Sequence, residues 1–198
     1  LGPVIIGNTA TVEPFTVLNG PLFLGRNTLV KSHSTISNSI INHDCKVSGE
    51  IYSCVFQPYS NKSHEGFLGH SFIGSWANLG AGTTTSNLKN NYSFVKVKWD
   101  GELIDTGSIF FGSIIGEHVK TAIGTNLNTG TVIELGCNIV SQTFPPRHVP
   151  AFSLFYKNKA IRIKFEDFCD IAEKAMKRRK KELLSSQKSM LNSIYKNY

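Results

Sequence analysis

The side chains best suited to chemistry in this sequence gather in one polar, glycine-rich segment, residues 61–92. Within it, Lys62, His64 and Lys89 stand among asparagines and glycines. An imidazole exchanges protons near neutral pH, and an ammonium group can pair with an anionic ligand. Glycines let the backbone approach such a ligand closely. The composition therefore predicts that residues 61–92 form an active-site segment.

Aliphatic side chains recur every six residues on both sides of this segment. The first run is Ile6, Val12, Leu18, Leu24, Val30 and Ile36; the beat shifts phase through Ile41 and Val47 and returns at Phe67, Ile73 and Leu79. The second run is Ile109, Ile115, Thr121, Leu127, Ile133 and Ile139. A period of six fits neither a helix nor a plain alternating strand, and it predicts an all-β fold, a parallel β-helix of hexapeptide repeats.

In such a fold three hexads close one triangular coil, and residues 18 apart stack in neighbouring coils about 4.8 Å apart. Ile6 should then lie against Leu24, and Val12 against Val30. Any single glycine of the pattern could be an ordinary turn residue. The joint spacing of the pattern favours the β-helix.

Two segments depart from the beat. Residues 94–99 alternate, and Asp100-Gly101 and residues 102–104 follow, which predicts a protruding loop or hairpin with a type I′ turn. The prolines of residues 144–150 lack backbone donors and are expected to end the coil.

The period changes after Phe165. Five apolar residues then share one helical face, which predicts a C-terminal α-helix from about residue 165 to about 185: Phe168, Ile171, Ala172, Ala175 and Met176. The polar residues 185–198 are expected to fray. We therefore expect two domains, a β-helix over residues 1–156 and a basic helical extension over residues 157–198.

The net charge of +7 is concentrated in that extension. Residues 1–156 hold nine Lys and Arg against nine Asp and Glu, and residues 157–198 hold twelve against five, which sum to the 21 and 14 of the whole chain. A neutral body argues against nucleic acid as a partner, and the basic run 177–181 is predicted to be a solvated helix face.

Composition also bears on location and on metals. No apolar run approaches the ~20 residues of a membrane span, and no signal segment opens the chain, so we expect a cytoplasmic protein. The four cysteines show no metal-site spacing and are expected to be free and buried. No metal is therefore predicted.

Three phrases of the central segment, residues 59–69, 76–83 and 86–90, resemble the acetyltransferase domain of GlmU-type enzymes, in particular a divergent bacterial branch of sugar-nucleotidyltransferase-like proteins. Similar phrases at 105–107, 116–121 and 127–131 extend the resemblance over residues 1–156. It implies a left-handed β-helix and an enzyme that moves acetyl from acetyl-CoA to the amine of glucosamine-1-phosphate, in UDP-N-acetylglucosamine biosynthesis. It also implies a homotrimer with its sites between subunits, and a chain that is the C-terminal part of a bifunctional nucleotidyltransferase/acetyltransferase.

The resemblance also implies roles for individual residues. His64 matches the general base, Lys62 and Lys89 are candidate contacts to the sugar phosphate, and Asn78 matches a contact to the acceptor sugar. The positions that match the acetyl-CoA site are Ala81, Asn87, Lys120 and Thr121. The plainer alternatives are a solvated histidine, surface lysines and turn asparagines.

Two departures from the family pattern leave the identity of the acceptor open. His70 replaces an aspartate expected near the base, and Leu88 stands where a tyrosine often follows the asparagine. Another amino or hydroxy sugar nucleotide could therefore be the substrate.

Two other classes of function fit the same scaffold. A zinc-dependent carbonic anhydrase is disfavoured because His64 and His70, six residues apart, should lie on adjacent faces of a coil. A non-catalytic β-helix that serves regulation or assembly is disfavoured by the intact motif around His64.

Overall fold

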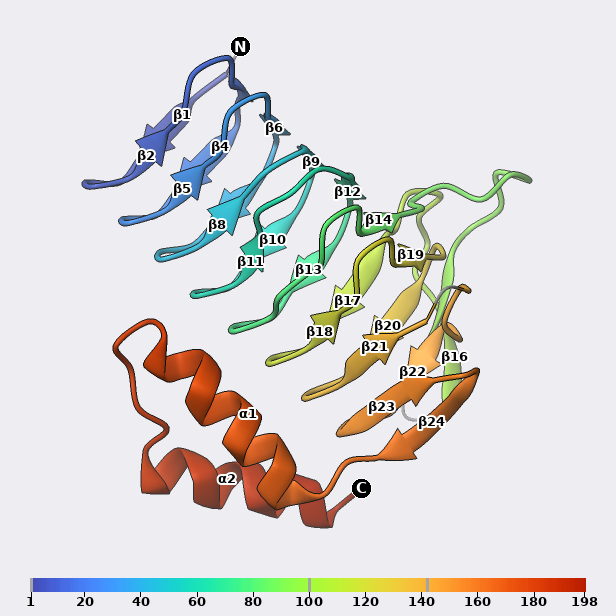
Figure 1. Ribbon diagram of the computed structural model, residues 1–198. Helices are drawn as coiled ribbons and strands as arrows, with labels where there is room; N and C mark the ends of the chain where they lie inside the picture. The colour runs from blue at the N-terminus through green and yellow to red at the C-terminus, as the bar shows by residue number, and fades with distance from the viewer. Residues whose placement is uncertain (1, 100, 142) are drawn as a thin grey trace.

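The computed structural model describes residues 2–99, 101–141 and 143–198, and Figure 1 shows a column of triangular coils with two helices beside it. The coils form a parallel β-helix, as the six-residue spacing predicted, and its left hand is what the family resemblance implied. Each full coil contributes one short strand, or a bridge, to each of three faces.

The first face is one parallel sheet, and the other two are assembled from smaller sheets and bridges. The first face contains β1 (Val4–Ile6), β4 (Leu22–Leu24), β7 (Ile40–Ile41), β10 (Val55–Phe56), β13 (Phe72–Ile73), β17 (Ser113–Ile115), β20 (Thr131–Ile133) and β22 (His148–Val149). The second contains β2 (Thr11–Val12), β5 (Leu29–Val30), β8 (Lys46–Val47), β11 (Asn61–Lys62), β18 (Lys120–Thr121), β21 (Asn138–Val140), β23 (Ser153–Tyr156) and the antiparallel edge strand β24 (Lys159–Arg162). The third contains β3 (Val17–Asn19), β6 (Thr35–Ser37), β9 (Glu50–Tyr52), β12 (Phe67–Gly69), β14 (Thr84–Thr85) and β19 (Asn126–Leu127).

The register explains both the beat and its shift of phase. Ile6 pairs with Leu24 and Val12 with Val30, 18 residues apart in each case, which confirms the predicted stacking. In the middle of the column the coils shorten: Lys46 pairs with Leu29, 17 residues before it, and with Asn61, 15 residues after it. The six-residue spacing changes phase because the corners of these coils are shorter, while the inward positions of the strands are kept.

The interior is mainly a stack of aliphatic and aromatic side chains. Along the first face its fully buried members are Leu24, Ile41, Phe56, Ile73, Ile115, Ile133 and Val149. Two predicted core positions are wrong. Phe67 faces outward while Leu68 is buried, because the preceding coil is shorter, and Ile109 lies in the returning arm of the long insertion, outside the coils.

The insertion contains the predicted hairpin. Strand β15 (Lys96–Trp99) pairs antiparallel with β16 (Glu102–Asp105). The predicted turn residue Asp100 lies outside the described residues. Val95 and Val97 are buried, and a Cβ atom on Gly130 would lie 2.8 Å from the carbonyl oxygen of Lys96, so the base of the hairpin packs against the later coils.

The expectation that the prolines end the coil is wrong. After them, β22 continues the first face and β23 the second. The backbone N–H of Val132 donates to the carbonyl of Arg147, and that of Glu134 to the carbonyl of Val149. The prolines stand in the corner between strands, where their missing N–H groups break no ladder bond.

The C-terminal extension holds two helices, α1 (Phe165–Lys177) and α2 (Ser185–Lys196). The first ends earlier than predicted, and the prediction of a fraying tail is wrong because α2 buries Leu191. The apolar faces of both helices share a core with the last coil, formed by Ala151, Phe152, Phe165, Phe168, Cys169, Ala172 and Leu191. The division into two domains stays a prediction.

A ladder of rings joins α1 to the corner between the first and second faces. Tyr59 stacks on Trp76 with centroids 4.2 Å apart, Trp76 stacks on His118 at 6.2 Å, and Phe168 of α1 meets His118 edge-on at 5.7 Å. Such ring contacts stabilise the packing by more than the burial of the rings alone. Figure 1 shows α1 running along the column below the row of turns.

Two simpler expectations can also be compared with the fold. Cys45, Cys54, Cys137 and Cys169 are free and buried, as predicted. Among the residues that the structure describes, neither helix is long and apolar enough to cross a bilayer.

Candidate active site

His64 occupies the corner between the second and third faces, between β11 and β12. Its side chain is exposed, and none of the described residues hydrogen-bonds its ring. Gly66 makes the corner possible: its φ is 118°, and a Cβ atom there would lie 2.4 Å from the carbonyl oxygen of Thr83 in the next coil. The imidazole is therefore held at an edge of the column and is open to a ligand.

Lys62 lies inside the coil, beneath this corner. It pairs with Val47 of the coil before and takes an inward position that the three earlier coils fill with valine, and its side chain is 0% exposed. Its Nζ donates hydrogen bonds to the carbonyl oxygens of His64, at 2.8 Å, and Glu65, at 2.9 Å. Burial lowers the pKa of Lys62 to about 8, against a smaller opposing effect of Glu65. The ammonium group thus stabilises the corner from inside the coil. The role of Lys62 as a substrate contact stays a prediction, and the burial of Lys62 does not favour it.

The second face carries a polar column beside the His64 corner. Asn61 donates from Nδ2 to Oδ1 of Asn78 at 2.7 Å, and Asn78 forms a β-bridge to Lys120. Burial lowers the pKa of Lys120, whose Nζ donates to the carbonyl oxygen of His118 at 3.2 Å. Two predicted contacts, Asn78 and Lys120, therefore lie next to each other.

The two small predicted contacts differ in orientation. Ala81 lies in the corner of the coil after His64, two residues before Thr83, and is half-buried. Thr121 points inward and is 6% exposed, and its Oγ1 lies 2.8 Å from Oγ1 of Thr83. Its hydroxyl therefore hydrogen-bonds inside the coil, and a contact between this hydroxyl and acetyl-CoA stays a prediction.

Asn87 stands at the opposite end of the third face, where the sequence did not predict its partner. Its Nδ2 donates to Nδ1 of His70 at 2.8 Å, across 17 residues. Burial lowers the pKa of His70, which favours the neutral ring that can accept this bond, and the ring stacks on Phe110 with centroids 5.2 Å apart. His70 thus replaces the family's aspartate with a residue that orients a predicted acetyl-CoA contact. In the sequence, the only sign of this contact is that His70 and Asn87 are 17 residues apart, which is one coil length in this part of the column.

Lys89 begins the insertion and borders a polar cavity of about 380 Å³. Its Nζ donates to Oγ of Ser93 at 3.2 Å and to the carbonyl oxygen of Phe94. Asn128 and Arg147 also line the cavity, and the sequence did not predict either as a site residue. A sugar phosphate could meet two cationic groups there.

The predicted residues thus fall into three groups on one chain: His64 with Ala81 at one corner, Asn78 with Lys120 on the second face, and Asn87 with Lys89 at the far end of the third face. Within the described parts of the chain, no group of three His, Cys, Asp or Glu side chains is placed to hold a metal ion.

Comparison with known proteins places these features in a family context. No family model matches the chain. It is 28% identical over 159 residues to the bifunctional protein GlmU of Methanococcus vannielii, which covers 80% of this chain and 33% of that protein. It is 30% identical over 138 residues to GlmU of Methanococcus aeolicus, covering 70% and 31%. A third relative, 35% identical over 86 residues, is a bifunctional sugar-1-phosphate nucleotidylyltransferase/acetyltransferase of Sulfurisphaera tokodaii, covering 43% and 21%.

Two solved structures show weaker likeness. The UDP-N-acetylglucosamine O-acyltransferase LpxA of Moraxella catarrhalis has a TM-score of 0.49 and 13% identity, covering 79% of this chain and 68% of that one. An acetyltransferase-like protein of Bacillus cereus has a TM-score of 0.48 and 13% identity, covering 88% and 86%.

The coil architecture defines a protein of the hexapeptide-repeat β-helix class. Within that class the chain is similar in sequence to bifunctional GlmU proteins, which confirms the predicted resemblance. The chain spans about one third of the length of the GlmU relatives that it matches.

The buried ammonium of Lys62 gives a test of this geometry that needs no substrate. Because folding lowers the pKa of Lys62 from 10.5 to about 8, the unfolded chain binds more protons between these values. The free energy of unfolding should therefore rise with pH in this window through this group. Lys62→Met removes this pH-dependent contribution to the free energy of unfolding. In urea unfolding, wild type should therefore gain stability relative to the variant when the pH is raised from about 7 to about 10.

Lys98→Met, at an exposed site on β15, is the matched control and should follow wild type at both pH values. A constant difference between wild type and Lys62→Met across the window would contradict the buried, charged state of Lys62.

Proposed function

We propose that this chain is an acetyl-CoA-dependent N-acetyltransferase that acts on an amino-sugar phosphate, with glucosamine-1-phosphate as the first candidate. The observation that carries the proposal is the exposed imidazole of His64, held at a glycine corner inside the segment that resembles the motifs of GlmU-type enzymes. In this proposal the chain supplies the acetyltransferase part of UDP-N-acetylglucosamine synthesis.

The chemistry follows from the groups present. His64 takes a proton from the amine of the sugar as the nitrogen attacks the thioester carbonyl carbon. A C–N bond forms, the carbonyl oxygen becomes an oxyanion, and collapse of this intermediate breaks the C–S bond and releases the CoA thiolate. Backbone N–H groups near Ala81 and the amide of Asn87 are our candidates for stabilising the oxyanion. The proton held by His64 can then neutralise the thiolate.

Lys62 acts in this scheme as a positioning residue. Its ammonium bonds the carbonyl oxygens of His64 and Glu65, so it fixes the backbone from which the imidazole projects. A base must lie within hydrogen-bond reach of the proton that it removes, and small displacements are costly to rate. The cavity beside Lys89 and Arg147 is our candidate for the sugar phosphate.

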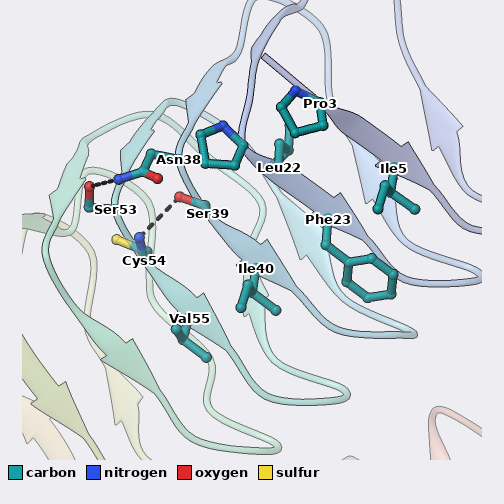
Figure 2. A pocket seen from close by; sticks show the side chains of 11 residues that line it. Pro3, Ile5, Leu22, Phe23, Asn38, Ser39, Ile40, Ser53, Cys54 and Val55 are labelled. Carbon is teal, nitrogen blue, oxygen red and sulfur yellow. Dashed lines mark hydrogen bonds between the residues drawn. The ribbon is translucent and has the colours of Figure 1, made fainter.

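We further propose that the protein works as a homotrimer. The outward side of the first face is an apolar row of Ile5, Phe23, Ile40, Val55, Phe72 and Ile114. Ile5 is 60% exposed and Ile40 is 47% exposed. Figure 2 shows Ile5, Phe23, Ile40 and Val55 along successive strands, beside a cavity of about 450 Å³. A continuous apolar face of this kind supports an interface, and a neighbouring copy could bring the separated groups of site residues together.

The cell compartment is also a proposal. Four buried free thiols support a reducing environment, and we place the enzyme in the cytoplasm. A second candidate function, transfer to another amino or hydroxy sugar nucleotide, is favoured by one observation: His70 and its bond to Asn87 replace the carboxylate of the family pattern.

The catalytic role of His64 can be tested by substitution. His64→Ala should lower kcat by ~10²–10⁴ and leave the affinity for acetyl-CoA nearly unchanged, because a positioned base contributes about this much to the chemical step alone. His33→Ala is the matched control, because His33 is exposed on a corner between the same two faces. Initial rates and a pH–rate profile are the measurements. Equal modest losses in both variants, or a loss confined to acetyl-CoA binding, would contradict a base role.

The trimer can be tested on the apolar row. Ile40→Glu places a charge in the middle of the proposed interface and should convert the trimer to monomers in sedimentation velocity. Ile161→Glu, at a similarly exposed site on β24, should sediment as wild type does. A wild-type chain that sediments as a monomer and still transfers acetyl would refute the proposal.

A further inference from the structure

The end of α1 and the second face enclose a cavity that the proposed chemistry has not used. Its volume is about 210 Å³, and Arg178 and Arg179 line it from the helix side. Lys120 and Asn78 line it from the β-helix side. Three cationic residues from two distant parts of the sequence therefore line one small space.

No acidic residue lines this cavity in the described part of the chain. Two of the four carboxylates of α1 are paired elsewhere, Asp170 with Lys174 at 2.6 Å and Glu173 with Lys188 at 3.5 Å, and the other two lie in the first turn, at the opposite end of the helix. Positive charge also acts on the neighbouring part of this face. Repulsion by Arg179, then burial, then repulsion by Arg178 and Lys31 lower the pKa of Lys46. The site has a surplus of positive charge without a protein counter-ion.

The walls of the cavity are held in place before any ligand arrives. Tyr59 and Trp76, stacked on each other, form its floor at the corner where Phe168 anchors α1 through His118. The backbone N–H groups of Arg178 and Arg179 donate to carbonyls of the last helical turn, so both side chains start from a fixed backbone. Preorganised donors bind an anion at a lower entropic cost.

We propose that this cavity binds a phosphate group of a small-molecule ligand, through Arg178, Arg179 and Lys120. Guanidinium groups match phosphate oxygens in pairs, and Lys adds a point charge. Pockets for whole drug-sized ligands occupy about 300–1,000 Å³, so a space of this size suits a phosphate and its nearest atoms, with the rest of the ligand lying outside. Two of the five residues in the basic run 177–181 thus face a cavity.

The source of the phosphate rests on the proposed function, under which two substrates carry one: CoA and the amino-sugar phosphate. Binding of inorganic pyrophosphate to the 198-residue chain does not depend on that function. The double variant R178Q/R179Q should weaken pyrophosphate binding by at least about tenfold in calorimetry, since it removes two charge-assisted contacts. The double variant K177Q/K180Q removes the same charge from the same turn, outside the cavity, and should stay within about twofold of wild type.

Further titrations distinguish the sources. A matching loss for CoA alone assigns the site to a CoA phosphate, and a loss for glucosamine-1-phosphate alone assigns it to the acceptor. A loss for pyrophosphate alone supports the phosphate site and leaves acetyl transfer intact, so it separates this inference from the proposed function. No binding of pyrophosphate to wild type would overturn the proposal. Equal weakening of binding in both double variants would also overturn it, because it would show only a general effect of positive charge.

Discussion

The structure depends on the stacking of inward side chains between neighbouring coils. One coil of about 18 residues cannot bury its own inner face, so each inward position is stabilised by the equivalent position above and below. This requirement fixes the three faces and their corners relative to one another. Lys62 takes one of these inward positions and uses it to hold the corner of His64. The chemistry is therefore coupled directly to the stack.

Much of the fold was predictable because its information is local and periodic. The pairing of Ile6 with Leu24 follows from the six-residue beat alone. The errors fall where a tertiary feature replaced the period. Phe67 faces outward because a coil is shorter by a few residues, and Ile109 leaves the stack because the insertion returns there. Residues 185–196 form a helix because α1 and the last coil offer an apolar surface that propensity does not reveal.

The site was less predictable than the fold. Motif similarity singled out His64, Asn78 and Asn87, but it carries no information on which way a side chain points. Lys62 and Thr121 turn into the coil, a result that follows from register and not from residue type. The bond between His70 and Asn87 and the place of Arg178 over the second face join residues far apart in sequence. Only the packed coils bring them together.

In the proposed reaction, the exposed imidazole of His64 deprotonates an amine that attacks acetyl-CoA. The most direct measurement is thiol release from acetyl-CoA in the presence of matched acceptors that differ only in the amine. We expect thiol release with glucosamine-1-phosphate, or with another amino sugar of the panel, and none above background with glucose-1-phosphate. No release with any amino sugar, or equal release with the amine-free sugar, would contradict it.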